Sequence, residues 1–312
     1  MRALIRAGRL PQPAEVRDDG AELVPREYFR LLDAAGGVGK LETYFRETYL
    51  RAAATGSVGT EWEAYLAGRS DIDVAVLEDP LAVEPERDTW PWHLWRELRR
   101  FRDGERRLAG ADGPGAARRR EQQLMRIGSA AWGSGLALLM LGRENDARSW
   151  LDRSALCYRR CLAEAEPGAW GRSIGAIKAR LIARDLSGAA REAQWTLELG
   201  AEAADSPIAK YASCLALLTV GEDRLAASLA TILAEHPNFP LATGEACRAL
   251  AVSDYGAYER SVREVLRTFE ERLRFLEDIP VADTVLALQV LAEQRGMAYR
   301  LDSPRLPPRL DS

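Results

Sequence analysis

The sequence predicts an all-α protein, built as a degenerate, tetratricopeptide-like array of helical hairpins with an N-terminal helical extension. Two observations predict this class. Apolar residues recur at steps of three and four over long stretches, as they do on one face of a helix, and four segments with similar openings follow one another from residue 142 onward. Few strands are expected. With 312 residues, 47% of them hydrophobic, the chain can bury one large core or two small ones.

The clearest helical pattern lies near the C-terminus. Its apolar stripe consists of Tyr258, Val262, Val265, Leu266, Phe269, Leu273 and Leu276. Opposite charges four residues apart, such as Glu259 and Arg263, mark the face turned to water. Pro280 is predicted to end this helix, because a proline forces the preceding residue away from helical geometry. Asp283 is predicted to lie in the first turn of the next helix, and Gly296 to close that helix.

The four similar segments each place a turn residue and an acid shortly before an alanine. They are GRENDARSWL at 142–151, RDLSGAAREA at 184–193, GEDRLAASLA at 221–230 and SDYGAYERSV at 253–262. The alanines taken as equivalent points of close helix approach are Ala147, Ala190, Ala227 and Ala257, which lie 43, 37 and 30 residues apart. This drift differs from the regular period of about 34 residues in a tetratricopeptide array. The hairpins are therefore expected to be degenerate.

The best candidate for a domain boundary lies near residue 90. The segment 71–92 contains three prolines and is predicted to form a long irregular connection. Residues 1–90 are accordingly predicted to be a helical extension with this connection, and residues 91–312 the helical-repeat domain. A helix is expected near residues 92–108 and a long one from about 116 to 141.

Composition restricts the classes of partner and the location. The net charge of -4 is small for 43 basic and 47 acidic residues, so no binding to nucleic acid or to an anionic membrane is expected. No apolar run approaches the roughly 18 residues of a membrane span, and the N-terminus lacks the apolar core of a signal peptide. A cytoplasmic location is expected. The four cysteines are too few for a disulfide framework in a chain of this length.

One acidic pair suggests an enzyme as an alternative. Gly56 and Ser57, followed by Asp71 and Asp73, resemble the nucleotidyltransferase signature. Two carboxylates that are two residues apart in a strand point the same way and could hold magnesium ions together. The other interpretation of this pair is a turn or a helix cap.

Two further groups of residues allow both a functional and a structural interpretation. Trp90, Trp92 and Trp95 surround His93 at a predicted helix start, where aromatic side chains could form a binding hot spot or anchor a core. Cys157 and Cys161 share a helical face, but no further ligand residues accompany them, so they are expected to pack in the core. No catalytic residue, cofactor or metal site is predicted for the helical-repeat domain.

Two segments carry a resemblance to a known family. RIGSAAW at 126–132 and the block 269–296 look like the immunity protein 49 family of bacterial polymorphic-toxin loci, and the similarity extends over roughly residues 120–307. The resemblance implies a protein without enzymatic activity that binds and neutralises a cognate toxin in the cytoplasm. A helical adaptor with a different protein partner is the other binding function.

The corner between the last two predicted helices is acidic. Glu277, Asp278 and Asp283 lie there and could meet a basic surface of a toxin. Alternatively, these carboxylates cap and solvate the corner.

Overall fold

A computed structural model describes residues 81, 84–110, 115–166, 168–273, 275 and 278–308. Within these residues it contains ten α-helices and no strand, so the predicted all-α class is confirmed. The chain divides into two compact units, Met1–Arg99 and Arg100–Ser312. Most of the predicted extension, residues 1–90, lies outside the described residues.

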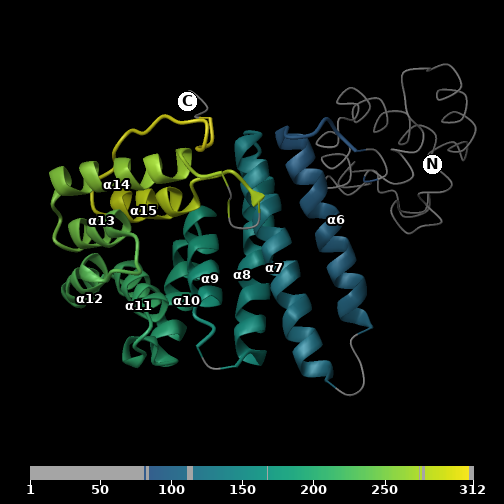
Figure 1. The fold of residues 1–312 in the computed structure, drawn as a ribbon, viewed down its shortest axis with the longest axis horizontal. Helices are drawn as coiled ribbons and strands as arrows, with labels where there is room; N and C mark the ends of the chain where they lie inside the picture. The colour runs from purple at the N-terminus through teal and green to yellow at the C-terminus, as the bar shows by residue number, and fades with distance from the viewer. Residues whose placement is uncertain are drawn as a thin grey trace, which may run out of the picture. The chain divides into compact units, whose positions relative to one another are not determined.

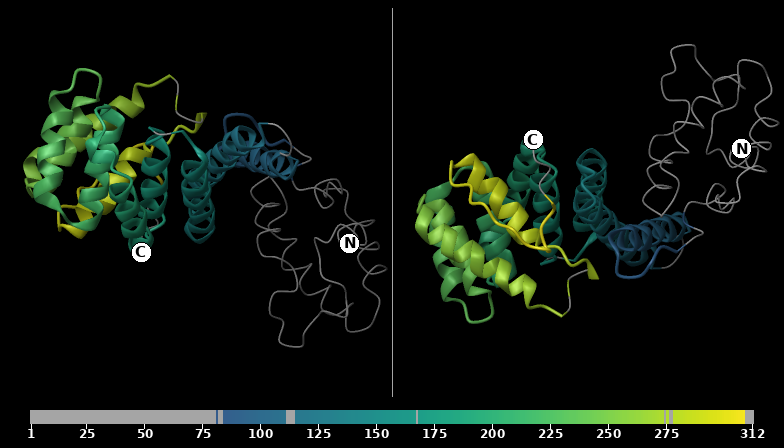
Figure 2. Two further views of the ribbon diagram at one scale, coloured as in Figure 1. Left: turned by 90° about the horizontal axis from the view of Figure 1, so that it is seen from below. Right: turned by 90° about the horizontal axis from the view of Figure 1, so that it is seen from above.

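The helices follow one another along the chain (Figures 1 and 2). In chain order they are α6 (Trp90–Ala109), α7 (Ala116–Met140), α8 (Glu144–Glu164), α9 (Gly171–Ile182), α10 (Leu186–Glu198), the short 3-10 helix η2 (Ala201–Ala203), α11 (Pro207–Val220), α12 (Asp223–Glu235), α13 (Leu241–Ala251), α14 (Tyr255–Glu270) and α15 (Asp283–Gln294). The first two confirm the helices expected near residues 92–108 and 116–141.

The described part of the first unit ends in the opening turns of α6. The hydroxyl oxygen of Thr89 accepts a hydrogen bond of 3.3 Å from the backbone N–H of Trp92, which caps the helix. Trp95 is buried, and its indole N–H donates to the carbonyl of Leu81 at 2.9 Å. Trp95 therefore belongs to the core of this unit.

In the second unit, each helix from α7 to α15 packs against the next along the chain. Close approach is possible because small residues lie at the contacts. The ring of Tyr158 in α8 lies between Gly128 of α7 and Gly175 of α9, where a Cβ would come within 3.1 and 2.8 Å of ring carbons. Any larger residue at Gly128, which belongs to the segment RIGSAAW, would require this ring to move.

The four similar segments all form the same helix–turn–helix junction. Each begins with a residue of positive φ: Gly142 (71°), Arg184 (62°), Gly221 (82°) and Ser253 (55°). The N–H of the following residue bonds to the carbonyl five residues earlier at 2.8 to 3.0 Å, which is the hydrogen bond of a Schellman motif. At each junction the next helix then starts two residues after the turn residue.

The predicted alanine register is wrong at three of the four junctions. Ala190, Ala227 and Ala257 are half-buried. The fully buried positions are Ala147, Ala189, Ala226 and Tyr258, each five residues after its turn residue. The turn residue fixes the helix start and therefore its buried face, whereas the choice between two adjacent alanines cannot be made from composition. Counted from the turn residues, the junctions lie 42, 37 and 32 residues apart.

Helix α14 is shorter than the sequence predicts. It ends at Glu270, so the prediction that Pro280 ends it is wrong. Leu273, expected on the buried stripe, lies outside the helix and is 98% exposed. Beyond it, Asp278 has φ 54° and the chain turns to bury Ile279, Val281 and Ala282. Burial of these three residues replaces the predicted burial of Leu273, and Leu276, the last residue of the predicted stripe, lies outside the described residues.

The rest of this C-terminal prediction is confirmed. Helix α15 begins at Asp283, which lies in its first turn, and Gly296 with φ 67° closes it. This helix packs against α9 and α13 as well as α14. It therefore joins the end of the array to an earlier part of it.

Candidate functional site

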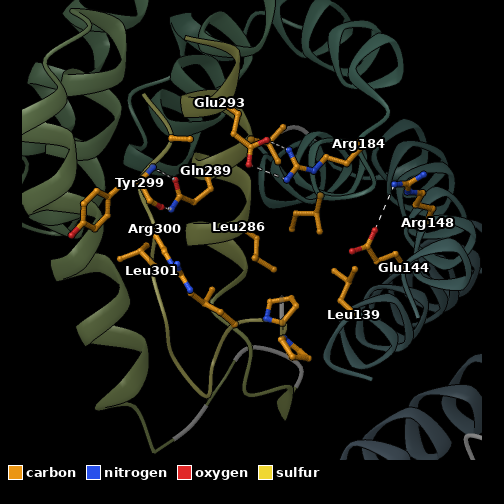
Figure 3. A pocket seen from close by; sticks show the side chains of 16 residues that line it. Leu139, Glu144, Arg148, Arg184, Leu286, Gln289, Glu293, Tyr299, Arg300 and Leu301 are labelled. Carbon is orange, nitrogen blue, oxygen red and sulfur yellow. Dashed lines mark hydrogen bonds and ion pairs between the residues drawn. The ribbon is translucent and has the colours of Figure 1, made fainter. Parts of the chain in front are cut away.

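A pocket of about 540 Å³ lies within the second unit, where the chain turns between helices (Figure 3). Its volume is in the range of about 300 to 1,000 Å³ that is typical of ligand sites. The lining comes from the ends of α7 and α9, the start of α8, one face of α15 and the segment that follows α15. Its apolar residues are Leu139, Ile182, Leu286, Val290, Ala298, Leu301, Leu306, Pro307 and Pro308.

Charged side chains from three helices complete the wall. Arg184 and Glu293 form a two-fold contact between the end of α9 and α15, in which Arg184 Nη1 bonds to Glu293 Oε2 and Nη2 to Oε1 at 3.0 Å. Arg148 lies 3.8 Å from Glu144 on the first turns of α8. All four side chains are substantially exposed, so these pairs can exchange partners with a bound ligand.

Arg184 has an unusual backbone conformation. It is the turn residue between α9 and α10 and adopts φ 62°, a conformation that glycine normally takes. An arginine in this conformation is strained by roughly 1 kcal/mol. The residue at this turn nevertheless carries the side chain that binds Glu293, 109 residues away in sequence.

The segment after α15 forms the remaining side of the pocket. The side-chain amide of Gln289 bonds to both the N–H and the carbonyl of Tyr299. The hydroxyl of Tyr299 accepts a hydrogen bond from Arg263 of α14, which raises the pKa of that guanidinium above its usual value. Further along, Ser303 donates to Glu270 at 2.6 Å, and the carbonyl of Arg305 accepts from the N–H of Ala282 at 2.9 Å. These bonds fix the segment along the array.

The predicted tryptophan cluster belongs to the first unit, and none of its residues lines the pocket. The rings of Trp90 and Trp92 each lie with their centroids 5.2 Å from that of His93. The indole N–H of Trp92 donates to Glu84 at 2.9 Å, and the guanidinium of Arg96 lies 5.0 Å from the ring centroid. Both tryptophans are half-buried, so part of each ring faces solvent.

Of the three residues of the predicted acidic corner, the structure describes Asp278 and Asp283. Glu277 lies outside the described residues. Asp278 is exposed, in a left-handed backbone conformation. Asp283 accepts a hydrogen bond from Lys178 of α9, and its side chain is 16% exposed. Its carboxylate is thus bound inside the second unit.

The sequence also pointed to an aspartate pair and to cysteines as possible catalytic or metal-binding residues. Asp71 and Asp73 lie outside the described residues. All four cysteines of the chain are free thiols. Burial raises the pKa of Cys161 to about 11, so this thiol is protonated at neutral pH. Among the residues that the structure describes, no three His, Cys, Asp or Glu side chains are grouped to hold a metal ion.

No helix in the described ranges carries an apolar stretch long enough to span a bilayer.

Sequence reasoning missed the pocket. Its charged residues come from segments far apart in the chain, and no local motif connects them; they are Glu144, Arg148, Arg184, Glu293 and Arg300.

Comparison of the chain with protein-family models, curated proteins and solved structures finds no match.

Proposed function

We propose that the chain is a protein-binding immunity protein that neutralises a cognate toxin by stoichiometric binding. The observation that carries the proposal is the position of the block 269–296. Its helix α15 provides one wall of the 540 Å³ pocket, so the segment that resembles the immunity protein 49 family also forms a candidate contact surface. Inhibition by occlusion requires a complementary surface and no catalytic group.

The architecture supports the same function. Consecutive helical hairpins form extended surfaces, and such arrays commonly bind other proteins. In this chain the segment RIGSAAW is buried in α7 from Ile127 to Trp132, where Gly128 accommodates Tyr158. This part of the resemblance therefore concerns the scaffold, whereas α15 combines buried positions with residues that line the pocket.

The proposal is tested by co-expression with the toxic product of a neighbouring gene. We expect the chain to restore growth of the host cell and the two purified proteins to elute together at an equal ratio. The double variant Asp71→Ala/Asp73→Ala is expected to rescue as well as the parent, because occlusion does not use this pair. No rescue, or rescue that depends on these two aspartates, would contradict the proposal. Loss of magnesium-dependent nucleotide consumption in the double variant would instead support the nucleotidyltransferase alternative.

A further inference from the structure

In the segment that follows α15, the backbone polar groups on one edge are hydrogen-bonded to the protein, and those on the opposite edge are not, within the residues that the structure describes. One side-chain amide, that of Gln289, bonds both the N–H and the carbonyl of Tyr299. These two backbone groups therefore point to the same side, as they do for a hydrogen-bonded residue in a β-strand. In such a conformation the N–H and carbonyl groups of the neighbours, Ala298 and Arg300, point to the opposite side.

The opposite edge is available for a partner. In the part of the chain that the structure describes, the backbone groups of Ala298 and Arg300 form no hydrogen bond. Both residues are exposed, and both line the pocket. An extended segment with an unpaired edge can bind another extended chain through main-chain hydrogen bonds.

The chemistry beside this edge favours an acidic and apolar peptide. Leu139, Leu286 and Leu301 line the pocket and can surround a large apolar side chain. Of the three arginines in the lining, Arg148 and Arg184 pair with glutamates, whereas Arg300 has no carboxylate partner among the described residues. The pocket lining thus has three arginines and two glutamates, a net charge of +1. A carboxylate of the ligand can balance this charge.

We propose that the pocket, together with the open edge at residues 298–301, binds an extended acidic peptide segment of a protein partner, with a large apolar side chain of that segment entering the pocket. The proposal deepens the proposed function, since it names the kind of segment that the partner presents. Because it concerns a peptide site, it is tested on the full-length protein without a toxin.

The probe is a fluorescein-labelled peptide of alternating leucine and glutamate, and binding is measured by fluorescence polarisation. Two control peptides are used: one with lysine in place of each glutamate, and one with N-methylated backbone amides. We expect the acidic peptide to bind about tenfold or more tightly than either control, because like charges repel and N-methylation removes main-chain donors. Equal binding of all three peptides, or no binding of the acidic one, would overturn the proposal.

Variants of the chain locate the site. Arg300→Glu reverses the unpaired charge and Leu286→Trp fills the pocket, so each is expected to weaken binding of the acidic peptide about tenfold. Arg224→Glu makes the same charge reversal on the exposed face of α12 and should leave binding unchanged. Circular dichroism of each variant verifies the helical fold. Unchanged binding by the two pocket variants would overturn the proposal, as would binding of dodecanoate without binding of the peptide, which would indicate a site for a small amphipathic anion.

Discussion

Lys178 is one of three lysines in the chain and is almost completely buried. Its ammonium group donates hydrogen bonds to Asp283 and to the hydroxyl of Thr284, the latter at 3.1 Å, and lies 5.8 Å from the centroid of the Trp132 ring. The ammonium group of this α9 residue therefore contacts side chains of both α7 and α15. Since a buried charge is tolerated only when it is paired, removal of either ionic partner should be costly.

We expect Lys178→Ala to lower the free energy of unfolding by about 3 kcal/mol, because the carboxylate of Asp283, which is only 16% exposed, then remains without a counter-charge. Urea denaturation monitored by circular dichroism measures this change. The double variant Lys178→Met/Asp283→Leu should recover much of the loss, since it replaces the pair by apolar side chains. Arg106→Ala breaks an exposed pair with Asp103 and should cost less than about 1 kcal/mol. A loss at Lys178 no larger than at Arg106 would refute this account of the buried pair.

Of the ionic pair in this cluster, sequence reasoning identified Asp283 but not Lys178. Asp283 was predicted in the first turn of a helix from the local pattern around Pro280, and that position is confirmed. Its partner Lys178 lies 105 residues earlier, and no local pattern connects the two. Sequence alone left two roles open for Asp283, a contact with a partner protein or a cap at the helix corner, and the structure shows its carboxylate bonded to Lys178.

At the scale of helices, prediction succeeded where local chemistry decides the outcome. The four turn residues and their following helix starts were recognisable because positive φ and capping depend on a few adjacent residues. Prediction was wrong where packing between distant segments decides, as at the end of α14, where burial of Ile279 and Val281 outweighs continuation of the helix through Leu273. The pocket combines both kinds of information, since Arg184 is a local turn residue but its contact with Glu293 is tertiary.

Helices α12 and α13 approach each other closely at Gly244, where a larger residue would meet backbone atoms. A Cβ at Gly244 of α13 would lie 2.7 Å from the backbone nitrogen of Ala234 in α12 and 2.9 Å from its Cα. We expect Gly244→Ala to destabilise the protein by about 1 to 3 kcal/mol, because backbone atoms cannot rotate away. Thermal and urea unfolding measure the effect.

The matched control is Gly256→Ala in α14. The added Cβ would lie 3.5 Å from Arg260 Nη1, which is ordinary contact, and alanine is the better helix former by about 0.5 to 1 kcal/mol. This variant should be neutral or more stable than the parent. The same loss of stability in both variants would mean that the approach of α12 and α13 is not the cause.

At the scale of the second unit, the array is closed by its last helix. A simple solenoid has contacts only between neighbouring repeats, so its parts can unfold separately. Here α15 packs against α9 and α13, and Arg295 at its end bonds to Asp223 of α12 and to the carbonyl of Leu218 in α11 at 2.7 Å. The contacts of α15 with α9, and of Arg295 with α11 and α12, join segments more than 70 residues apart, which explains why the sequence predicted consecutive hairpins but not their closure.

This closure predicts a particular pattern of hydrogen exchange. The side chain of Arg295 is 10% exposed, and its removal leaves the carboxylate of Asp223 and a carbonyl of α11 without their donor. We expect Arg295→Ala to lower the protection of amides in α11, α12 and α15 together, because these helices open as one cooperative unit. Native-state hydrogen exchange followed by mass spectrometry resolves the three helices, and Arg224→Ala on the exposed face of α12 is the control. If only α15 lost protection, it would be an independently docked element, and the second unit would behave as an open array in which each hairpin is stabilised by its immediate neighbours.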